Sequence, residues 1–218
     1  MPTAAAEQRS DPWEMALIHR LIICGFSQAR EFVQSRPTTP SRVPAVAEYV
    51  RFHLDGLHAH HSTEDELLWP ALHERASLSD ALIDRMERQH AGISEAVRRT
   101  RERLEAWTAA HTNQTSDALA EALGEVSDRL AEHLAEEERD IVPIIAEHIT
   151  QREWEDLGKR SFDKFSPGQR FTAMGEMISA ATPAESARML ASLPAPIRVV
   201  WRLVGRRRYD RLMAQVRG

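Results

Sequence analysis

Apolar residues recur every three or four positions in four long stretches of the chain, with polar residues between them. This spacing places the apolar residues on one face of a helix, so the sequence predicts four long amphipathic helices. The predicted inner faces comprise Met15, His19, Ile22, Phe26 and Val33; Val46, Tyr49, His53, Leu57, His60, Glu64 and Leu67; Leu82, Met86, His90, Ile93, Val97, Leu104 and Trp107; and Leu123, Val126, Leu130, His133, Glu137, Ile141 and Ile144.

The boundaries of these helices are marked by turn and capping residues. Asp11 and Pro12 signal the first start, 36–44 is a proline-rich loop, Ser77 or Ser79 caps the third helix, and 111–116 is a polar turn. Short connections between long amphipathic helices predict an all-α protein with an antiparallel up-down four-helix bundle in residues 1–149. Three further helix starts predict a helical extension in residues 150–218; they are Thr150 with Glu153, Ser166 with Pro167, and Thr182 with Pro183 and Glu185.

One phrase of the sequence occurs twice. Residues 60–70 read HHSTEDELLWP and residues 133–143 read HLAEEERDIVP, and each has a His, a Glu four residues later and a Pro ten residues later. Each copy also follows a lone histidine in the preceding helix, His19 in the first case and His90 in the second. The repeat therefore predicts pseudo-twofold symmetry.

The residues of this repeat are suited to binding metal. Residues four apart on a helix share a face, so His60 with Glu64 and His133 with Glu137 can each approach one ion. A single inward histidine is more often a satisfied core residue, but the duplication in phase favours ligands, because buried imidazoles and carboxylates are costly without partners. Four histidines and two glutamates predict two metal ions, and a set without thiolate suits iron or manganese and also zinc.

Composition and charge narrow the class of protein. The content of 42% hydrophobic and 28% charged residues is ordinary for a globular protein. The single cysteine, Cys24, excludes an internal disulfide and thiolate metal clusters, and favours a reducing, cytoplasmic location. The net charge of −5 is uneven, because residues 197–218 contain seven Arg and one Asp, a net of +6, which leaves −11 for the rest.

The chain resembles hemerythrin-like (HHE cation-binding) proteins, especially bacterial ones with a C-terminal helical extension. The resemblance rests on ALIHR around His19, the two repeated phrases, ERQH ending at His90, and the tail LPAPIRVVWRLVGRRRY. It implies a four-helix bundle that holds a non-haem di-iron centre with oxygen bridging the irons. Matched residue by residue, it implies His19 and His60 on one iron, His90 and His133 on the other, and Glu64 and Glu137 as bridges.

The chain also departs from the oxygen-carrying hemerythrins. They have a further histidine four residues before the one that matches His90, where this chain has Met86, and they end with HxxxxD where this chain has HxxxE. Six protein ligands would leave the irons open to exogenous molecules, so a long-lived oxygen adduct is not expected. The ferritin-like di-iron class needs two ExxH motifs, and Glu87 with His90 is the only one.

Several polar residues near the repeated motif fit more than one role. Tyr49 and His53 share the face of His60, so they could line a ligand pocket, donate protons, coordinate the metal or hydrogen-bond to its ligands. Gly56 could leave room beside iron or allow close helix packing. His58, His61 and His73 are predicted to lie at the surface or at the edge of the core face. Glu66, Glu136 and Glu138 are predicted to turn toward solvent or toward positions that support the ligands from outside.

These observations predict a di-iron protein that binds or reacts with dioxygen, hydrogen peroxide or nitric oxide. A peroxidase-type oxidoreductase active in oxidative stress is one hypothesis, and a non-catalytic sensor or store of oxygen, nitric oxide or iron is the other. No flavin or nucleotide motif accompanies the bundle, so an electron donor would be a separate molecule. We expect neither nucleic acid nor membrane as a partner, because the Arg-rich tail is predicted to dock on its own acidic bundle, burying Trp201, Val204 and Leu212.

Overall fold

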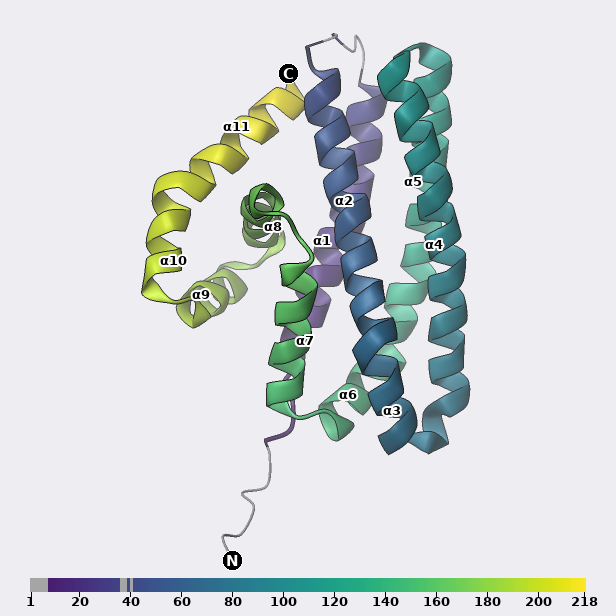
Figure 1. Cartoon of the computed structure of the whole chain (residues 1–218), viewed down its shortest axis with the longest axis vertical. Helices are drawn as coiled ribbons and strands as arrows, with labels where there is room; N and C mark the ends of the chain where they lie inside the picture. Colours follow the sequence, from purple (N-terminus) through teal and green to yellow (C-terminus); the bar gives the residue numbers. More distant parts are fainter. Residues whose placement is uncertain (1–7, 36–38, 40) are drawn as a thin grey trace, which may run out of the picture.

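The computed structural model describes residues 8–35, 39 and 41–218, and in this part of the chain every named element is helical (Figure 1). The predicted all-α class is therefore confirmed. The α-helices are α1 (Trp13–Gln34), α2 (Val43–Thr63), α3 (Trp69–Arg75), α4 (Asp80–Ala109), α5 (Asn113–Glu136), α6 (Val142–His148), α7 (Gln151–Asp163), α8 (Pro167–Ala180), α9 (Pro183–Ser192), α10 (Ala195–Val200) and α11 (Arg206–Arg217).

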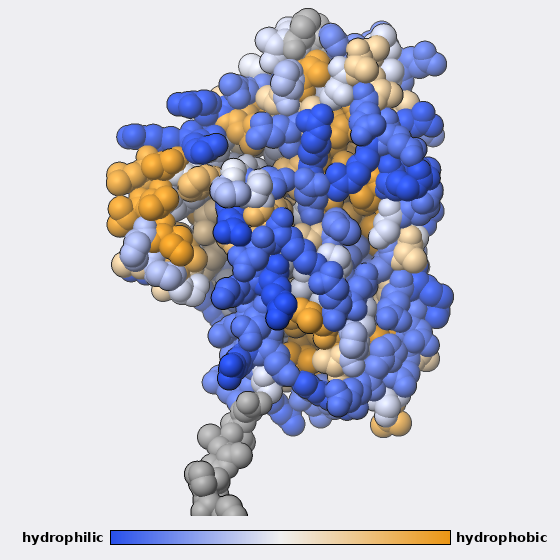
Figure 2. Space-filling model, viewed as in Figure 1, coloured by the Kyte–Doolittle hydropathy of each residue, from blue (hydrophilic) through white to orange (hydrophobic). Residues whose placement is uncertain are grey.

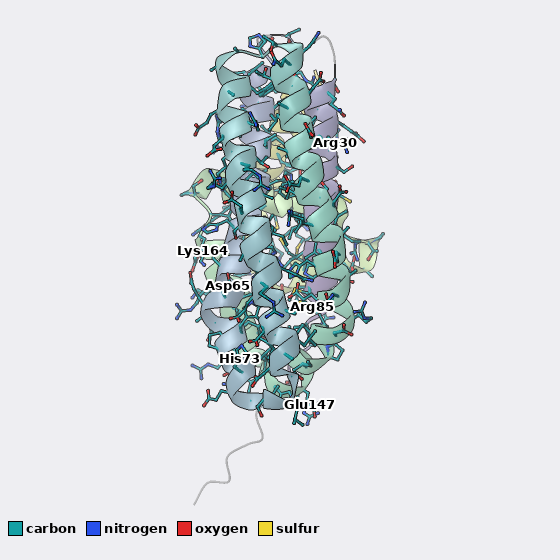
Figure 3. The ribbon with its side chains drawn as sticks, turned by 90° about the vertical axis from the view of Figure 1, so that its right-hand side faces the viewer. Arg30, Asp65, His73, Arg85, Glu147 and Lys164 are labelled. Carbon is teal, nitrogen blue, oxygen red and sulfur yellow. The ribbon has the colours of Figure 1, made fainter. Side chains whose placement is uncertain are left out.

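The four longest helices lie side by side (Figures 1 and 3). Helix α1 contacts α2 and α5, and α4 contacts the same two helices. Their apolar faces meet in one cluster in which Phe26, Val46, Leu123 and Trp107 are at most 1% exposed. Full burial of one such side chain stabilises a fold by about 1.5–3 kcal/mol, so these faces hold the helices in the register that positions the site.

Three of the predicted helix starts have the expected side-chain caps, and two do not. Thr150, Ser166 and Thr182 each accept a hydrogen bond from the backbone N–H three residues later, in reciprocal capping boxes. Ser79 stands directly before α4, but its side chain makes no capping hydrogen bond. Asp11 does not cap α1: the residue before the helix is Pro12, and the Asp11 carboxylate instead pairs with Arg188 of α9 at 2.6 Å.

The two repeated phrases adopt π-helical turns at equivalent places. The π-segments η1 (Glu64–Leu68) and η3 (Glu137–Ile141) each begin at the glutamate of the repeat and are followed by α3 and α6. Pro70 and Pro143 stand at the second position of those helices, where a proline ring clashes with the carbonyl four residues back. The wider π-turn relieves this clash, so each helix continues past its proline.

The C-terminal helices pack on one side of the long helices (Figure 1). Helix α7 contacts α2, α8 contacts α1, and α11 contacts both α2 and α8. Met213 and Val216 join the core cluster of the long helices, and Arg42 Nε donates a hydrogen bond to the carbonyl of Val216 at 2.5 Å. Among the described residues, no helix combines the length and the apolarity that crossing a bilayer requires.

Candidate metal centre

The six residues of the predicted ligand set converge at one level inside the long helices. Each of them is at most 8% exposed. Glu137 Oε2 lies 3.3 Å from His19 Nε2 and 3.6 Å from His133 Nε2. Glu64 Oε1 lies 3.3 Å from His60 Nδ1, and its Oε2 lies 3.6 Å from His90 Nε2. Each carboxylate therefore reaches imidazoles on two different helices.

The donor atoms fall into two adjacent groups. His19, His60 and Glu137 form the first group, and His61, His90 and His133 form the second; within each group the ligand atoms lie within 4.8 Å of one another. Glu64 groups with His60 and His61 and so lies between the two.

Several polar atoms of the centre make no hydrogen bond, although they are buried. In the described part of the chain these atoms are Nε2 of His19, His60 and His61 and both carboxylate oxygens of Glu64 and Glu137; the only other such atom is Nε2 of His53. Buried polar groups are nearly always hydrogen-bonded, and leaving one unpaired costs about 1–3 kcal/mol. Orphaned imidazole nitrogens and carboxylates that face one another fit a metal site, because cations would satisfy all of them together.

Three of the histidines are oriented by partners outside the centre. In each case one ring nitrogen, Nδ1, shares a hydrogen bond with a neighbouring side chain, which directs Nε2 inward. Asp65, one of these partners, is labelled in Figure 3. The pairs are His19 with Glu138 at 2.9 Å, His90 with Asp65 at 2.6 Å, and His133 with Gln89 at 2.8 Å.

Burial keeps the imidazoles of His60 and His133 neutral and available as ligands. Burial lowers the pKa of His60 to about 3 and the pKa of His133 to about 4, so both rings are neutral at pH 7 and retain a lone pair. Burial and the nearby charge of Glu137 raise the pKa of Glu64. Burial raises the pKa of Glu137, but the combined interactions with His19, His60 and His133 outweigh it and lower that pKa to about 2.

One residue of the centre was missed by the sequence reasoning. His61 was expected at the surface, yet it is 3% exposed, and its ring stacks on that of His90 with centroids 4.0 Å apart. The residue after an inward position points about 100° around the helix, and here that direction faces α4 rather than solvent. The His-His doublet at 60–61 was the available signal.

The three glutamates next to the predicted ligand glutamates make different contacts. Glu136, predicted to face solvent or to support the ligands from outside the centre, is 5% exposed, accepts a hydrogen bond from Gln89 at 2.9 Å and forms an ion pair with Arg85 at 3.0 Å. It thus fixes the Gln89 side chain that contacts His133. Glu138 contacts His19, whereas Glu66 is exposed and pairs with Lys164.

Tyr49 and His53 belong to a second buried polar cluster. Their partner is Glu176 of α8, which accepts hydrogen bonds from Tyr209 at 2.9 Å and Tyr49 at 3.4 Å and lies 3.7 Å from His53 Nε2. His53 precedes His60 by about two helical turns, or roughly 10 Å. Gly25 makes room for it, because a Cβ there would lie 2.0 Å from the His53 ring. A Cβ on Gly56 would lie 3.4 Å from the Phe165 ring, which is an ordinary van der Waals contact.

Glu176 should make the stability of the metal-free protein pH-dependent. Burial raises its pKa above the unfolded value despite the tyrosine hydrogen bonds, so its contribution to stability is present below pH 4.5 and is lost as pH rises through the folded pKa. The variant Glu176→Gln stays neutral. We expect its unfolding free energy, minus that of wild type, to increase from about pH 5 to about pH 8 in urea titrations. A difference that stays constant with pH, as expected for the exposed control Glu132→Gln, would contradict this.

Comparison with known proteins agrees with the geometry. The model of the Hemerythrin HHE cation binding domain matches residues 14–145, a range that holds every residue of the centre from His19 to Glu137. Comparison with curated proteins and with solved structures gives no significant match.

Proposed function

The chain belongs to the hemerythrin HHE cation-binding domain family, and from this premise we propose that its buried centre holds two iron ions. His19 and His60 would bind one ion, and His61, His90 and His133 the other. Glu64 and Glu137 would bridge them. The observation that carries the proposal is the set of buried imidazole and carboxylate atoms that have no hydrogen-bond partner.

Iron is the metal that the donor set and the family favour together. Imidazole and carboxylate ligands suit iron, manganese and zinc, and the sole cysteine, Cys24, is exposed and belongs to none of the donor groups of the described residues. In this proposal α1, α2, α4 and α5 form the antiparallel up-down bundle of the family. Residues 150–218 form an extension docked on that bundle, with Met213 and Val216 in the shared core.

The proposed activity is the reduction of small oxidants, as in a peroxidase-type detoxifying protein. All seven donor residues are at most 8% exposed, which favours molecules as small as dioxygen, hydrogen peroxide or nitric oxide. The iron ions would supply one-electron redox chemistry. Reduction of one hydrogen peroxide to two water molecules takes two electrons and two protons, and a separate electron donor would provide the electrons. The chain's own residues would hold the ions and restrict access.

A sensor or store is the second candidate, and one contact favours it. Glu176, on α8 of the C-terminal extension, contacts Tyr49 and His53 on α2, the helix that also carries His60 and His61. A shift of α2 on ligand binding would therefore reach the extension. In either function, Tyr49 and His53 act through Glu176 rather than as metal ligands.

Repeated turnover distinguishes the two functions. Iron-reconstituted protein mixed with excess peroxide and an artificial one-electron donor is expected to consume many equivalents of peroxide per chain, measured by peroxide loss and donor oxidation. The His60→Ala variant should consume none above free iron. Consumption of no more than one equivalent, together with a changed optical spectrum, would contradict the peroxidase and favour the sensor.

A further inference from the structure

Exposed apolar side chains are concentrated on one short stretch of the C-terminal helix. The described residues have seven exposed large hydrophobic side chains, and five of them lie within residues 197–204. Figure 2 shows them as an apolar area on the side of the molecule where Figure 1 places α10. We call this set the apolar ridge; it consists of Ile197, Val199, Val200, Leu203 and Val204, each 47–59% exposed.

The opposite face of the same helix is held in place. Trp201 is 8% exposed and packs with Met174 and Met189, and a Cβ on Gly205 would lie 2.4 Å from the Trp201 ring. Val204 was expected to be buried with Trp201, but it is 47% exposed. The π-segment η4 (Trp201–Gly205) explains the difference, because its wider turn directs Val204 away from the face of Trp201. The outward direction of the ridge is thus set by packing.

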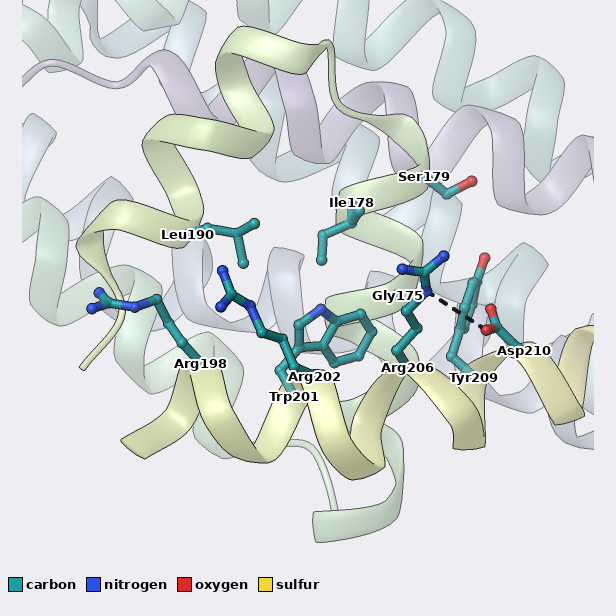
Figure 4. Close-up of a pocket in the computed structure, with 10 residues that line it drawn as sticks. All are labelled: Gly175, Ile178, Ser179, Leu190, Arg198, Trp201, Arg202, Arg206, Tyr209 and Asp210. Carbon is teal, nitrogen blue, oxygen red and sulfur yellow. Dashed lines mark ion pairs between the residues drawn. The ribbon is translucent and has the colours of Figure 1, made fainter. Parts of the chain in front are cut away.

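Arginines surround the ridge almost without acidic residues. Residues 195–209, which contain the ridge, include five Arg and no Asp or Glu. Behind the ridge, Arg198, Arg202 and Arg206 line a cavity of about 550 Å³ between this helix and α8 and α9 (Figure 4). Asp210 is the acidic residue of that lining, and it pairs with Arg206 at 3.8 Å.

We propose that the apolar ridge docks on an anionic lipid surface. A helix with aliphatic residues on one side and arginines beside them is the pattern of segments that lie in a membrane interface, where apolar side chains enter the acyl boundary and arginines reach phosphates. This binding requires no membrane-spanning helix. It also revises the expectation that the tail has no lipid partner. The inner face of the tail packs on α8 and α9 through Trp201 and on the bundle through Met213 and Val216, while the ridge remains exposed.

A second copy of the chain is a poorer occupant. A twofold interface would place the same patch on both subunits face to face, so the arginines of one ridge would oppose those of the other. Like charges held together across an interface disfavour association, whereas anionic lipid attracts each arginine. The positive charge beside the ridge therefore favours binding to anionic lipid over self-association.

Vesicle co-sedimentation of the full-length protein in about 0.15 M salt tests the proposal. Wild type is expected to bind vesicles of phosphatidylcholine mixed with phosphatidylglycerol but not pure phosphatidylcholine. Leu203→Glu/Val204→Glu should bind at least about twentyfold more weakly, because each charge near the surface changes binding about fivefold. Arg202→Gln/Arg207→Gln, which leaves the ridge intact, should also weaken binding about fivefold per arginine.

The matched control is Ile23→Glu/Leu78→Glu, which makes the same charge change at two exposed apolar residues outside the ridge. It is expected to bind like wild type, with circular dichroism confirming that all variants are folded. Failure of wild type to bind the anionic vesicles, or an equal loss in the control, would overturn the proposal. So would a wild-type dimer in sedimentation that Leu203→Glu/Val204→Glu abolishes, because the ridge would then be a contact between copies.

Discussion

Replacing Glu64 with leucine is expected to abolish iron binding and, at the same time, to stabilise the metal-free protein. Both Glu64 oxygens are buried without a hydrogen bond, and burial together with Glu137 raises its pKa, so the metal-free fold carries an unpaired carboxyl group. Removing that group while keeping its volume should raise the unfolding free energy by about 1–3 kcal/mol. Without the bridge between His60 and His90, neither ion would be held.

The two effects are measured on the same samples. Iron per chain is determined after reconstitution, and urea unfolding is followed with and without iron. Iron should raise the stability of wild type, since binding to the folded state alone shifts the equilibrium, and should leave Glu64→Leu unchanged. Glu132→Leu, an exposed change on α5, should retain iron. A metal-free Glu64→Leu protein less stable than wild type would show that Glu64 contributes to the fold itself and not only to the metal.

The sequence predicted the inner faces of the helices and several helix starts correctly, because both depend on the spacing of residues that are close together in the chain. The inner faces carry Phe26, Val46 and Trp107 into one core, and the Thr150 and Thr182 capping boxes form as their spacing indicates. Such signals depend on a few neighbouring residues. The Asp11 cap was mispredicted because the Asp11 carboxylate pairs with Arg188, a tertiary partner 177 residues away in sequence, instead of with the start of α1.

A constant helical period cannot predict the π-turns. The sequence reasoning used 3.6 residues per turn throughout, but η1, η3 and η4 each add a residue to a turn. Within η4 the wider turn rotates the exposed face, which is why Val204 was assigned to the wrong side. The prolines at 70 and 143 indicated a disturbance, yet they could not show that the helices would widen rather than end.

The duplicated motif predicted the six residues that the structure brings together, because it repeats in phase with the helical face. The motif could not reveal His61, which lies outside the repeat: the second copy has Leu134 at the matching position. Whether a residue beside the inner stripe is buried depends on how closely the neighbouring helix approaches. Helix spacing is a tertiary property, and a single helical pattern does not contain it.

His61→Ala is expected to remove one iron ion and spare the other. His61 groups with His90 and His133, whereas His19, His60 and Glu137 form the other donor group. Loss of one of three imidazoles should weaken the second group at least about 100-fold, because even an outer partner of a ligand is worth about 10–100-fold in affinity. Iron analysis should then give one ion per chain, with the optical bands of a coupled pair absent.

His58→Ala is the matched control, because His58 lies on the same helix three residues earlier and is exposed. It should bind iron as wild type does. If His61→Ala keeps both ions with unchanged spectra, His61 is only a ring stacked on His90, and the second ion has an open position where the oxygen carriers place a histidine. In that event Met86, fully buried one turn before His90, would stand where that histidine lies. If instead both ions are lost, the two groups bind cooperatively through Glu64 and Glu137.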